Sequence, residues 1–430
     1  MNIRLSAGAA EAIHRLEEAG FEAYVVGGCV RDCLMGKTPH DYDITTSAVP
    51  DETITAFSGA SFDKEPKIIE TGLKHGTVTV ILNDEQVEIT TFRTESGYSD
   101  FRRPDRVDFS DKLEDDLSRR DFTINAMAYS PKTGLFDTFG GVSDLEDRII
   151  RAVGSPAERF REDPLRILRA LRFAARLGFT IESDTDKECR ANAGLLGLVA
   201  GERIYTELRG LFEGRYSGQV LADHIEIIDV IMPGAAKNED LTRRLMQMDF
   251  SQYEQPWIQG FAALITGQDD KSDNNASVGA IINRPSAPCK FHNVKKPIQA
   301  VEEIHSRLKL DAYTYDTLRF LAENQRRIIP DEDQFILRRL SQWGEDRLRQ
   351  LLILQDNISS LDRMENLIKS GKCYSLKQMQ VSGGDLIKIG IPSGKQIGLV
   401  LKSLLRGITD GKLANDRDAL LEKAREITKG

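Results

Sequence analysis

The chain has 430 residues, 40% of them hydrophobic and 29% charged, which is typical of a globular protein with room for two to four domains. Its net charge of −9 argues against a protein coated in nucleic acid, although local basic surfaces stay possible. No apolar run reaches 18 residues, so no transmembrane helix is predicted, and the acid-containing N-terminus does not resemble a signal peptide.

The cysteines and the charge distribution indicate where such a protein works. Of the five cysteines only Cys29 and Cys33 lie close together, and no second pair of ligands accompanies them. We therefore expect reduced thiols in a cytoplasmic protein rather than a zinc site. Residues 371–430 hold eight Lys and three Arg against six acids. This basic end permits contact with RNA, whereas a solvated helical face is the simpler interpretation.

The first predicted elements are a helix over residues 4–19 and a short apolar strand over Tyr24–Val26. Gly27 and Gly28 follow, just before a predicted helix that opens near Arg31. Bare backbone N–H groups at a helix start favour anions, so this turn suggests a phosphate site. A guanidinium at Arg31 can clamp a triphosphate, with a surface ion pair as the alternative.

A pair of carboxylates follows, at Asp41 and Asp43, just before Ile44. On a strand these side chains lie on one face, because strand side chains alternate with period two. Mg²⁺ is typically held by one or two carboxylates plus substrate phosphates, so the pair predicts a magnesium site. A polar loop is the alternative, and residues 45–50 are expected to be a loop.

Residues 74–82 and 86–93 predict two strands joined by a turn at 83–85, which makes the sheet at least partly antiparallel. Glu88 lies on the second strand between two apolar residues. It is a third catalytic candidate, because a further carboxylate there could complete a two-metal site for phosphoryl transfer. A solvent-facing glutamate on an edge strand is equally compatible with the pattern.

Residues 94–111 are polar and predict a long mobile loop, after which residues 113–130 predict a helix. Within that helix Arg120 could reach a phosphate and Asp121 a ribose hydroxyl. The alternative is that Asp121 caps a helix whose arginines are solvated.

From residue 157 onward the pattern is almost wholly helical, with a soft boundary at 266–290 and a helix start at 390–395. The segment from Glu162 to Arg172 is the sharpest feature, because its arginines recur every three residues on one ridge. Asp163 and Arg166 are neighbours at i, i+3. A carboxylate beside a guanidinium could accept the amino group and pair with the ring nitrogen of cytosine or adenine, and reject uracil and guanine. A capped helix with an exposed basic stripe is the alternative.

Five motifs occur in order along the chain: GGCVRD (27–32), DYD (41–43), RRDFTINA (119–126), EDPLRILRALRF (162–173) and ERIYTEL (202–208). They resemble the motifs of the class II CCA-adding tRNA nucleotidyltransferases and bacterial poly(A) polymerases, members of the DNA polymerase beta superfamily. The resemblance spans most of the chain and is weakest over 235–330.

The resemblance implies an α+β nucleotidyltransferase head with a mixed sheet, followed by an all-α neck, body and tail. The implied boundaries are 1–152 for the catalytic head, 153–215 for the neck that recognises the base, 216–330 for the body and 331–430 for the tRNA-binding tail. The implied activity is template-independent addition of C, C and A to the 3′ end of tRNA from CTP and ATP. A poly(A) polymerase, an A-adding enzyme and a catalytically silent RNA-binding protein on the same scaffold are the alternatives.

The resemblance also implies roles for the site residues. No membrane and no further protein partner are expected, and the 94–111 loop is implied to help the site switch from CTP to ATP. The implied roles are Mg²⁺ binding by Asp41 and Asp43, triphosphate binding by Gly28 and Arg31, nucleotide contact by Arg120, and a protein template for C and A made by Asp163 and Arg166, with Arg169 and Arg172 in the same pocket.

Overall fold

A computed structural model describes residues 3–58, 66–70, 72–98, 101, 104–233, 235, 239–266 and 295–429. The chain divides into two compact units, Met1–Glu254 and Gln255–Gly430, called unit 1 and unit 2 below. The four-part division expected from the sequence is finer than this and stays a prediction. In the described residues, no helix combines the length and the apolar character that spanning a membrane requires.

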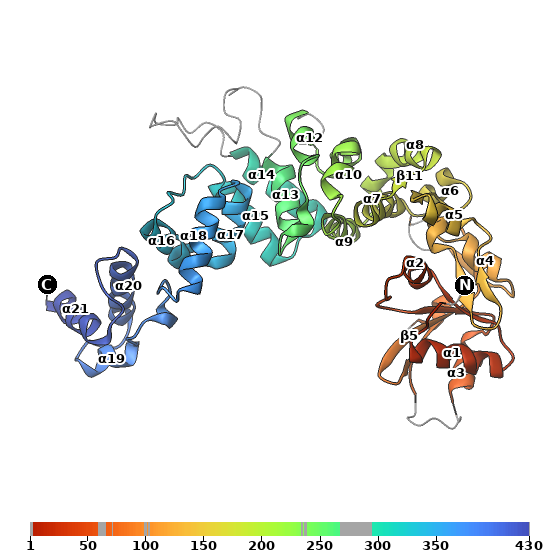
Figure 1. Cartoon of the computed structure of the whole chain (residues 1–430), viewed down its shortest axis with the longest axis horizontal. Helices are drawn as coiled ribbons and strands as arrows, with labels where there is room; N and C mark the ends of the chain where they lie inside the picture. The colour runs from red at the N-terminus through yellow and green to blue at the C-terminus, as the bar shows by residue number, and fades with distance from the viewer. Residues whose placement is uncertain are drawn as a thin grey trace. The chain divides into compact units, whose positions relative to one another are not determined.

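Unit 1 contains a seven-stranded mixed sheet in the order β3-β4-β5-β2-β1-β8-β9 (Figure 1). The β2–β5 pair is parallel and the other pairs are antiparallel, as the predicted hairpin requires. The hairpin turn consists of Asn83 and Asp84, both with positive φ, which suits the twist of paired strands. The strands of the sheet are β1 (Ala23–Val26), β2 (Asp43–Thr46), β3 (Lys67–Ile69), β4 (Thr77–Leu82), β5 (Glu85–Thr91), β8 (Ala128–Ser130) and β9 (Gly134–Phe136).

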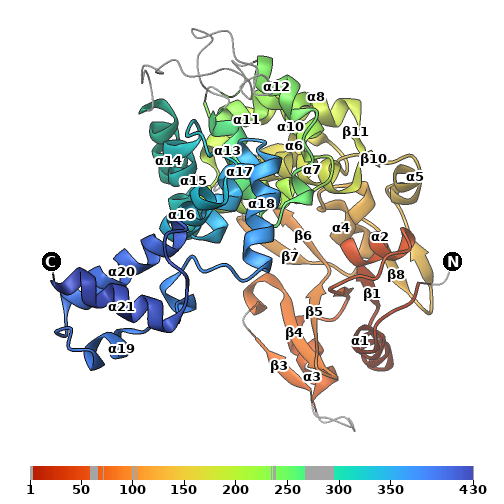
Figure 2. The ribbon, with the colours of Figure 1, turned by 60° about the vertical axis from the view of Figure 1, so that its left-hand side comes forward.

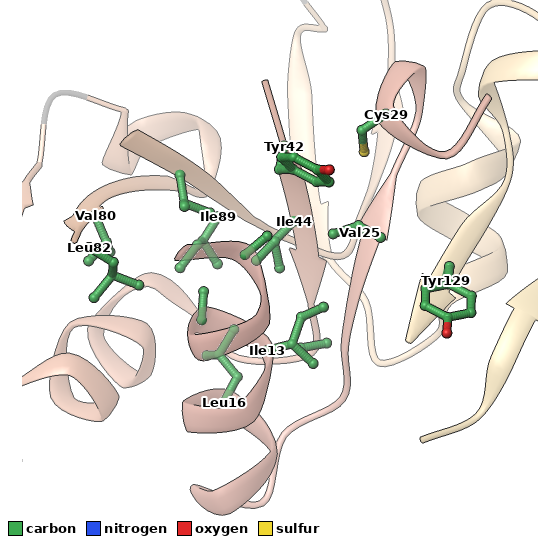
Figure 3. Close-up of a cluster of buried hydrophobic side chains, with 14 of the residues drawn as sticks. Ile13, Leu16, Val25, Cys29, Tyr42, Ile44, Val80, Leu82, Ile89 and Tyr129 are labelled. Carbon is green, nitrogen blue, oxygen red and sulfur yellow. The ribbon is translucent and has the colours of Figure 1, made fainter. Parts of the chain in front are cut away.

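The two faces of this sheet have different coverings, because side chains alternate along each strand. On one face, α1 (Ala7–Glu18) and α3 (Pro50–Phe57) pack a buried apolar cluster that includes Ile13, Val25 and Ile44 (Figure 3). On the other face Val26 packs against α4 (Leu113–Ser118). Asp43 and Glu88 alternate with residues of the first cluster, so they lie on the α4 face.

The remaining elements of unit 1 are mostly helices, coloured from red to green in Figure 2. Two short two-stranded pairs, β6–β7 and β10–β11, accompany them in the described residues. These elements are α2 (Gly28–Leu34), β6 (Arg93–Ser96), β7 (Arg106–Phe109), α5 (Gly141–Glu146), β10 (Ile149–Ile150), α6 (Pro156–Glu162), α7 (Leu165–Leu177), β11 (Thr180–Ile181), α8 (Ser183–Asn192), α9 (Gly201–Phe212), α10 (Ser217–Asp223), α11 (Ile225–Ile231) and α12 (Glu239–Leu245), with 3₁₀ turns at Leu73–His75, Thr123–Asn125, Ala193–Leu198 and Phe250–Gln252.

Three expectations for local structure were wrong. The segment 94–111 is not a loop in its described residues, because β6 and β7 pair antiparallel there, with Ser96 opposite Arg106. β6 contains no apolar residue and β7 only Val107 and Phe109, so the segment shows little of the alternation that indicates a strand. Residues 99, 100, 102 and 103 lie outside the described residues.

The helix expected over 113–130 ends at Ser118. The reason is local: Asp121 accepts the N–H of Phe122 at 2.8 Å, and Phe122 has extended backbone angles. Thr45 and Thr46, expected in a loop, belong to β2, where Thr46 pairs with Ala23. Both threonines are buried, so their polarity misled the prediction.

Unit 2 is helical in its described residues, as expected (Figure 1). Its last part has a small core of its own, which includes Leu386, Leu404 and Leu420. The predicted helix start at 390–395 is confirmed, while 267–290 lies outside the described residues. The helices are α13 (Pro256–Thr266), α14 (Lys295–Leu308), α15 (Ala312–Asn324), α16 (Asp333–Trp343), α17 (Glu345–Leu354), α18 (Ile358–Lys369), α19 (Gly383–Lys388), α20 (Lys395–Thr409) and α21 (Arg417–Lys429), with a 3₁₀ turn at Leu376–Gln378.

Candidate active site

The glycine turn after β1 is closely surrounded by arginines. Gly27 precedes α2 with φ 83°, a conformation that side chains disfavour. A Cβ atom at Gly27 would lie 3.0 Å from Nη1 of Arg120, and one at Gly28 would lie 3.5 Å from Nη2 of Arg31. Arg31 is fixed by Asn125, whose Oδ1 accepts from Nη1 at 2.7 Å, and by Asp32 at 2.8 Å. Two guanidiniums thus lie beside the start of α2, while the N–H of Gly27 itself donates to the carbonyl of Met127 at 3.2 Å.

Carboxylates lie beside this turn at the end of β2. Asp43 pairs with Glu88 across the parallel β2–β5 ladder, so their side chains lie on the same face. Asp41 precedes the strand rather than lying on it, but Tyr42 between them is buried while both aspartates are exposed. The alternation predicted for Asp41 and Asp43 is thus present.

Asp41, Asp43 and Glu88 form a carboxylate cluster, and the surroundings of Asp43 raise its proton affinity. The pKa of Asp43 is raised, first because neighbouring protein desolvates it and then because Glu88 and Asp41 lie near, while Arg120 opposes the shift. In the part of the chain that the structure describes, no group of three or more His, Cys, Asp or Glu side chains is arranged to hold a metal ion unaided. A divalent ion here would therefore need oxygen ligands from a substrate as well.

Asp163 and Arg166 do not pair through their side chains. The carboxylate of Asp163 accepts from Arg203 on α9 at 3.2 and 2.7 Å. Arg166 donates to Glu162 at 3.2 Å and to the carbonyl of Arg119 at 2.9 Å. Only backbone joins the two predicted partners, since the N–H of Arg166 donates to the carbonyl of Asp163 at 3.0 Å.

The other two arginines of α7 are engaged with buried acids. Arg169 donates through Nε to Asp121 at 2.8 Å, and Arg172 lies 2.8 Å from Glu207 of α9. Burial alone would raise the pKa of Asp121, but the charges of Arg169 and Arg166 outweigh it and lower that pKa to about 2. Since its oxygens also accept from Phe122 and Asn125, Asp121 is a structural anchor rather than a free ribose ligand.

An aromatic ring lies between α2, which follows the glycine turn, and the arginines of α7. The guanidiniums of Arg31, Arg169 and Arg172 lie 5.3, 5.5 and 5.0 Å from the centre of the Phe173 ring, within the range of cation–π contact. Phe173 also packs edge-on against Phe122 at 5.8 Å. Arg31 of α2 and two arginines of α7 thus contact the same aromatic ring.

Several of these supporting residues were not singled out from the sequence. Arg203 and Glu207 lie four residues apart on α9, so helical spacing places them on one face. That signal was present in ERIYTEL, but nothing in the sequence indicated that this face meets α7. The missed residues are Asn125, Phe173, Arg203 and Glu207.

Comparison with known proteins identifies the class first. Residues 23–151 match the family described as Poly A polymerase head domain, and residues 178–238 match the probable RNA and SrmB-binding site of polymerase A. Residues 325–424 match the putative tRNA nucleotidyltransferase domain 2. The fold and these matches define a nucleotidyltransferase. Nucleotidyltransferases of this kind generally use divalent metal ions.

Full-length relatives narrow the class. The chain is 36% identical to the CCA-adding enzyme of Leuconostoc mesenteroides, covering 96% of this chain and 94% of that protein. It is 34% identical to that of Limosilactobacillus fermentum, with 97% and 96% covered. A crystal structure of the Bacillus stearothermophilus CCA-adding enzyme in complex with CTP matches with a TM-score of 0.71 and 27% identity, covering 98% and 97%. The chain belongs to the CCA-adding enzyme family.

Proposed function

We propose that this protein adds C, C and A to the 3′ end of tRNA from CTP and ATP, releasing pyrophosphate, without a nucleic-acid template. The observation that carries the proposal is the register of Asp43 with Glu88 beside the Gly27 turn, in a chain similar over its full length to CCA-adding enzymes. Nucleotidyl transfer requires carboxylates that can hold a metal ion next to a site that binds anions.

Mg²⁺ is the proposed metal, held by Asp41 and Asp43. The donor set fits, because both side chains are exposed carboxylates on one side of the strand, and Mg²⁺ usually takes one or two carboxylates plus substrate phosphates. When bound, the ion would lower the pKa of the attacking 3′ hydroxyl and neutralise the departing pyrophosphate. Glu88 would add negative charge beside Asp43 and so strengthen the preference for a cation.

The triphosphate would lie against the glycine turn. Gly28 would offer backbone N–H groups, and Arg31 and Arg120 would offer guanidiniums, which bind phosphate oxygens in pairs. Arg31 is already held by its hydrogen bond to Asn125, so its side chain would lose little conformational freedom when the triphosphate binds.

The base would be selected at the start of α7. Asp163 would accept the amino group of cytosine or adenine, and Arg166 would donate to the adjacent ring nitrogen. Uracil and guanine present the opposite order of donor and acceptor there, so they would leave polar groups unpaired. Arg169 and Arg172 would form the wall of the pocket, where their pairing with Asp121 and Glu207 supports a rigid shape.

The helical parts of the chain would bind the tRNA, through backbone contacts and shape rather than sequence. The basic excess of residues 371–430 supports a role for the C-terminal end in this contact. A cytoplasmic location stays a prediction that follows from the proposed substrate.

A three-way extension assay tests the function. The full chain is given Mg²⁺ and a tRNA that ends at the discriminator base, with CTP alone, ATP alone, or both, and, as a second substrate, a tRNA that ends in CC with ATP. We expect growth by two nucleotides with CTP and by three with both. Long tails with ATP alone would identify a poly(A) polymerase, and growth by one A only on a tRNA ending in CC would identify an A-adding enzyme. Absence of any growth would indicate a silent RNA-binding protein.

A further inference from the structure

Asp116 is a fully buried carboxylate outside the residues assigned above. It lies on α4 between Leu113 and Leu117, which pack on the face of the sheet that carries Asp43. An ionised group in such a place is unfavourable unless it is paired. Burial alone would raise the pKa of Asp116, but the charges of Arg120 and Arg119 outweigh it and lower that pKa. The carboxylate is therefore ionised and has two cationic partners.

Each oxygen of Asp116 serves a different arginine. Oδ1 accepts from Nε and Nη2 of Arg119 at 3.0 and 2.6 Å, while Oδ2 accepts from Nη2 of Arg120 at 3.1 Å. Arg119 has a second carboxylate partner, because its Nη1 donates to Glu95 of β6 at 3.1 Å. Arg119 would therefore stay held without Asp116.

Arg120 has no such second support. Its Nε is buried and finds no acceptor among the described residues, and Asp116 is the one ion-pair partner they give it. Its Nη1 faces the glycine turn, 3.0 Å from the position that a Cβ of Gly27 would occupy. The direction of this guanidinium thus depends on a single carboxylate oxygen.

The alternative direction for Arg120 leads toward the metal carboxylates. Asp43 lies opposite Val26 in the β1–β2 ladder, next to Gly27, which Arg120 faces. An Arg120 released from Asp116 could move to pair with Asp43, which would neutralise a proposed Mg²⁺ ligand and remove a donor from the triphosphate site.

We infer that Asp116 is a positioning residue that directs Arg120 at the phosphates of the incoming nucleotide, a role that rests on the proposed function. Because Arg120 faces the phosphate side of the site and not the base, the effect is shared by CTP and ATP. Asp116 itself touches no substrate. Second-layer partners of this kind are commonly worth 10- to 100-fold in activity.

The test compares steady-state kinetics of full-length Asp116→Asn with wild type, using CTP on a tRNA ending at the discriminator base and ATP on a tRNA ending in CC. Asp186→Asn is the matched control, because Asp186 on α8 likewise gives one oxygen to each of two cations, Arg190 and His224, away from the site. We expect KM for both nucleotides to rise roughly tenfold in Asp116→Asn and to stay within about twofold of wild type in Asp186→Asn.

KM is the deciding readout, because loss of folded protein lowers the apparent kcat but leaves KM unchanged. A double-mutant cycle gives the second readout: in an Arg120→Ala background, Asp116→Asn should add little further effect. If Asp116→Asn alone does not fold, Arg119→Gln and Arg119→Gln/Asp116→Asn make the same comparison, since the double variant removes one charge of each sign and still leaves Arg120 unanchored.

An unchanged KM, a rise for only one nucleotide, or full additivity with Arg120→Ala would each overturn the inference while wild type still adds C, C and A. A wild-type protein that adds no nucleotide would instead overturn the proposed function, and this inference with it.

Discussion

The two halves of the site differ in whether their charged side chains form ion pairs within the protein. In the carboxylate cluster on the central strands β2 and β5, Asp41, Asp43 and Glu88 are exposed, and no ion pair joins them to a cation among the described residues. Along α7, by contrast, Arg166, Arg169 and Arg172 are each engaged with a protein acid. One half holds like charges close together, and the other is already neutralised.

The difference fits the two tasks. Like charges that are held close together repel one another, and a bound cation would relieve that repulsion. A base pocket has to keep one shape, because discrimination depends on leaving the wrong base unpaired, and paired arginines supply that rigidity. From this contrast we expect substitutions in the carboxylate cluster to lower activity without lowering stability. Substitutions along α7 should lower both.

Asp43→Asn is expected to have the largest effect. The change removes one proposed metal ligand at constant shape, so nucleotide addition should fall by about 10³-fold or more. The thermal midpoint of unfolding should stay the same or rise, because repulsion with Glu88 and Asp41 is relieved. Primer-extension rates and thermal melts of the same preparation check both parts.

Asp51→Asn serves as the control for Asp43→Asn, since Asp51 is an exposed acid on α3, on the opposite face of the sheet. It should keep normal activity. A large loss of stability in Asp43→Asn would show that the carboxylate cluster is a structural ion network instead of a site for a cation.

Asp121→Asn should have the next largest effect, and on stability. The folded pKa of about 2 is depressed from the ordinary 3.8, so the contribution of Asp121 is present above pH 3.8 and is lost as the pH falls toward 2. The shift corresponds to about 2 kcal/mol, and the half-buried Arg169, left with Glu207 at 3.9 Å, raises the expected loss at pH 7 to about 3 kcal/mol. Urea unfolding at pH 7 and pH 3 measures it.

The sign of the pH dependence decides the interpretation of Asp121→Asn. The difference in unfolding free energy between wild type and variant should be smaller at pH 3 than at pH 7. A difference that is equal at both values would mean that Asp121 acts through its hydrogen bonds and not through its charge.

Short-range patterns predicted the parts of the site that depend on neighbouring residues. The glycine turn, the alternation of Asp41 with Asp43 and the hairpin after Leu82 follow from local spacing and turn chemistry. Side-chain pairs between distant segments could not be predicted, because no periodicity records them. Asn125 holds Arg31 across 94 residues, and Arg203 holds Asp163 across 40.

The local errors have physical reasons of the same kind. The helix expected after Leu113 ends early because the Asp121 side chain takes a backbone N–H, which competes with helix formation. β6 has no apolar residue and β7 has only Val107 and Phe109, so the pair carried too short an alternation to indicate two strands. The expectation that Asp163 pairs with Arg166 considered only residues on one helix, while the partner lies on α9.

Arg203→Ala is expected to have the smallest of these effects, and on base choice. The variant removes both bonds from Arg203 and leaves the Asp163 carboxylate only the N–H of Leu165, so Asp163 can turn more freely to suit the wrong base. The preference for CTP over UTP, measured as a ratio of kcat/KM values, should fall about tenfold, which corresponds to about 1.4 kcal/mol.

Arg190→Ala is the matched comparison for Arg203→Ala, since Arg190 also joins two helices of unit 1 through acids, Asp186 and Glu226. Both variants lose a partly exposed ion pair, so both should lose similar stability. Only Arg203→Ala should change the CTP to UTP ratio. If the ratio is the same in both variants, the ion pair with Asp163 has no part in base choice. The paired charges along α7 would then contribute to packing alone.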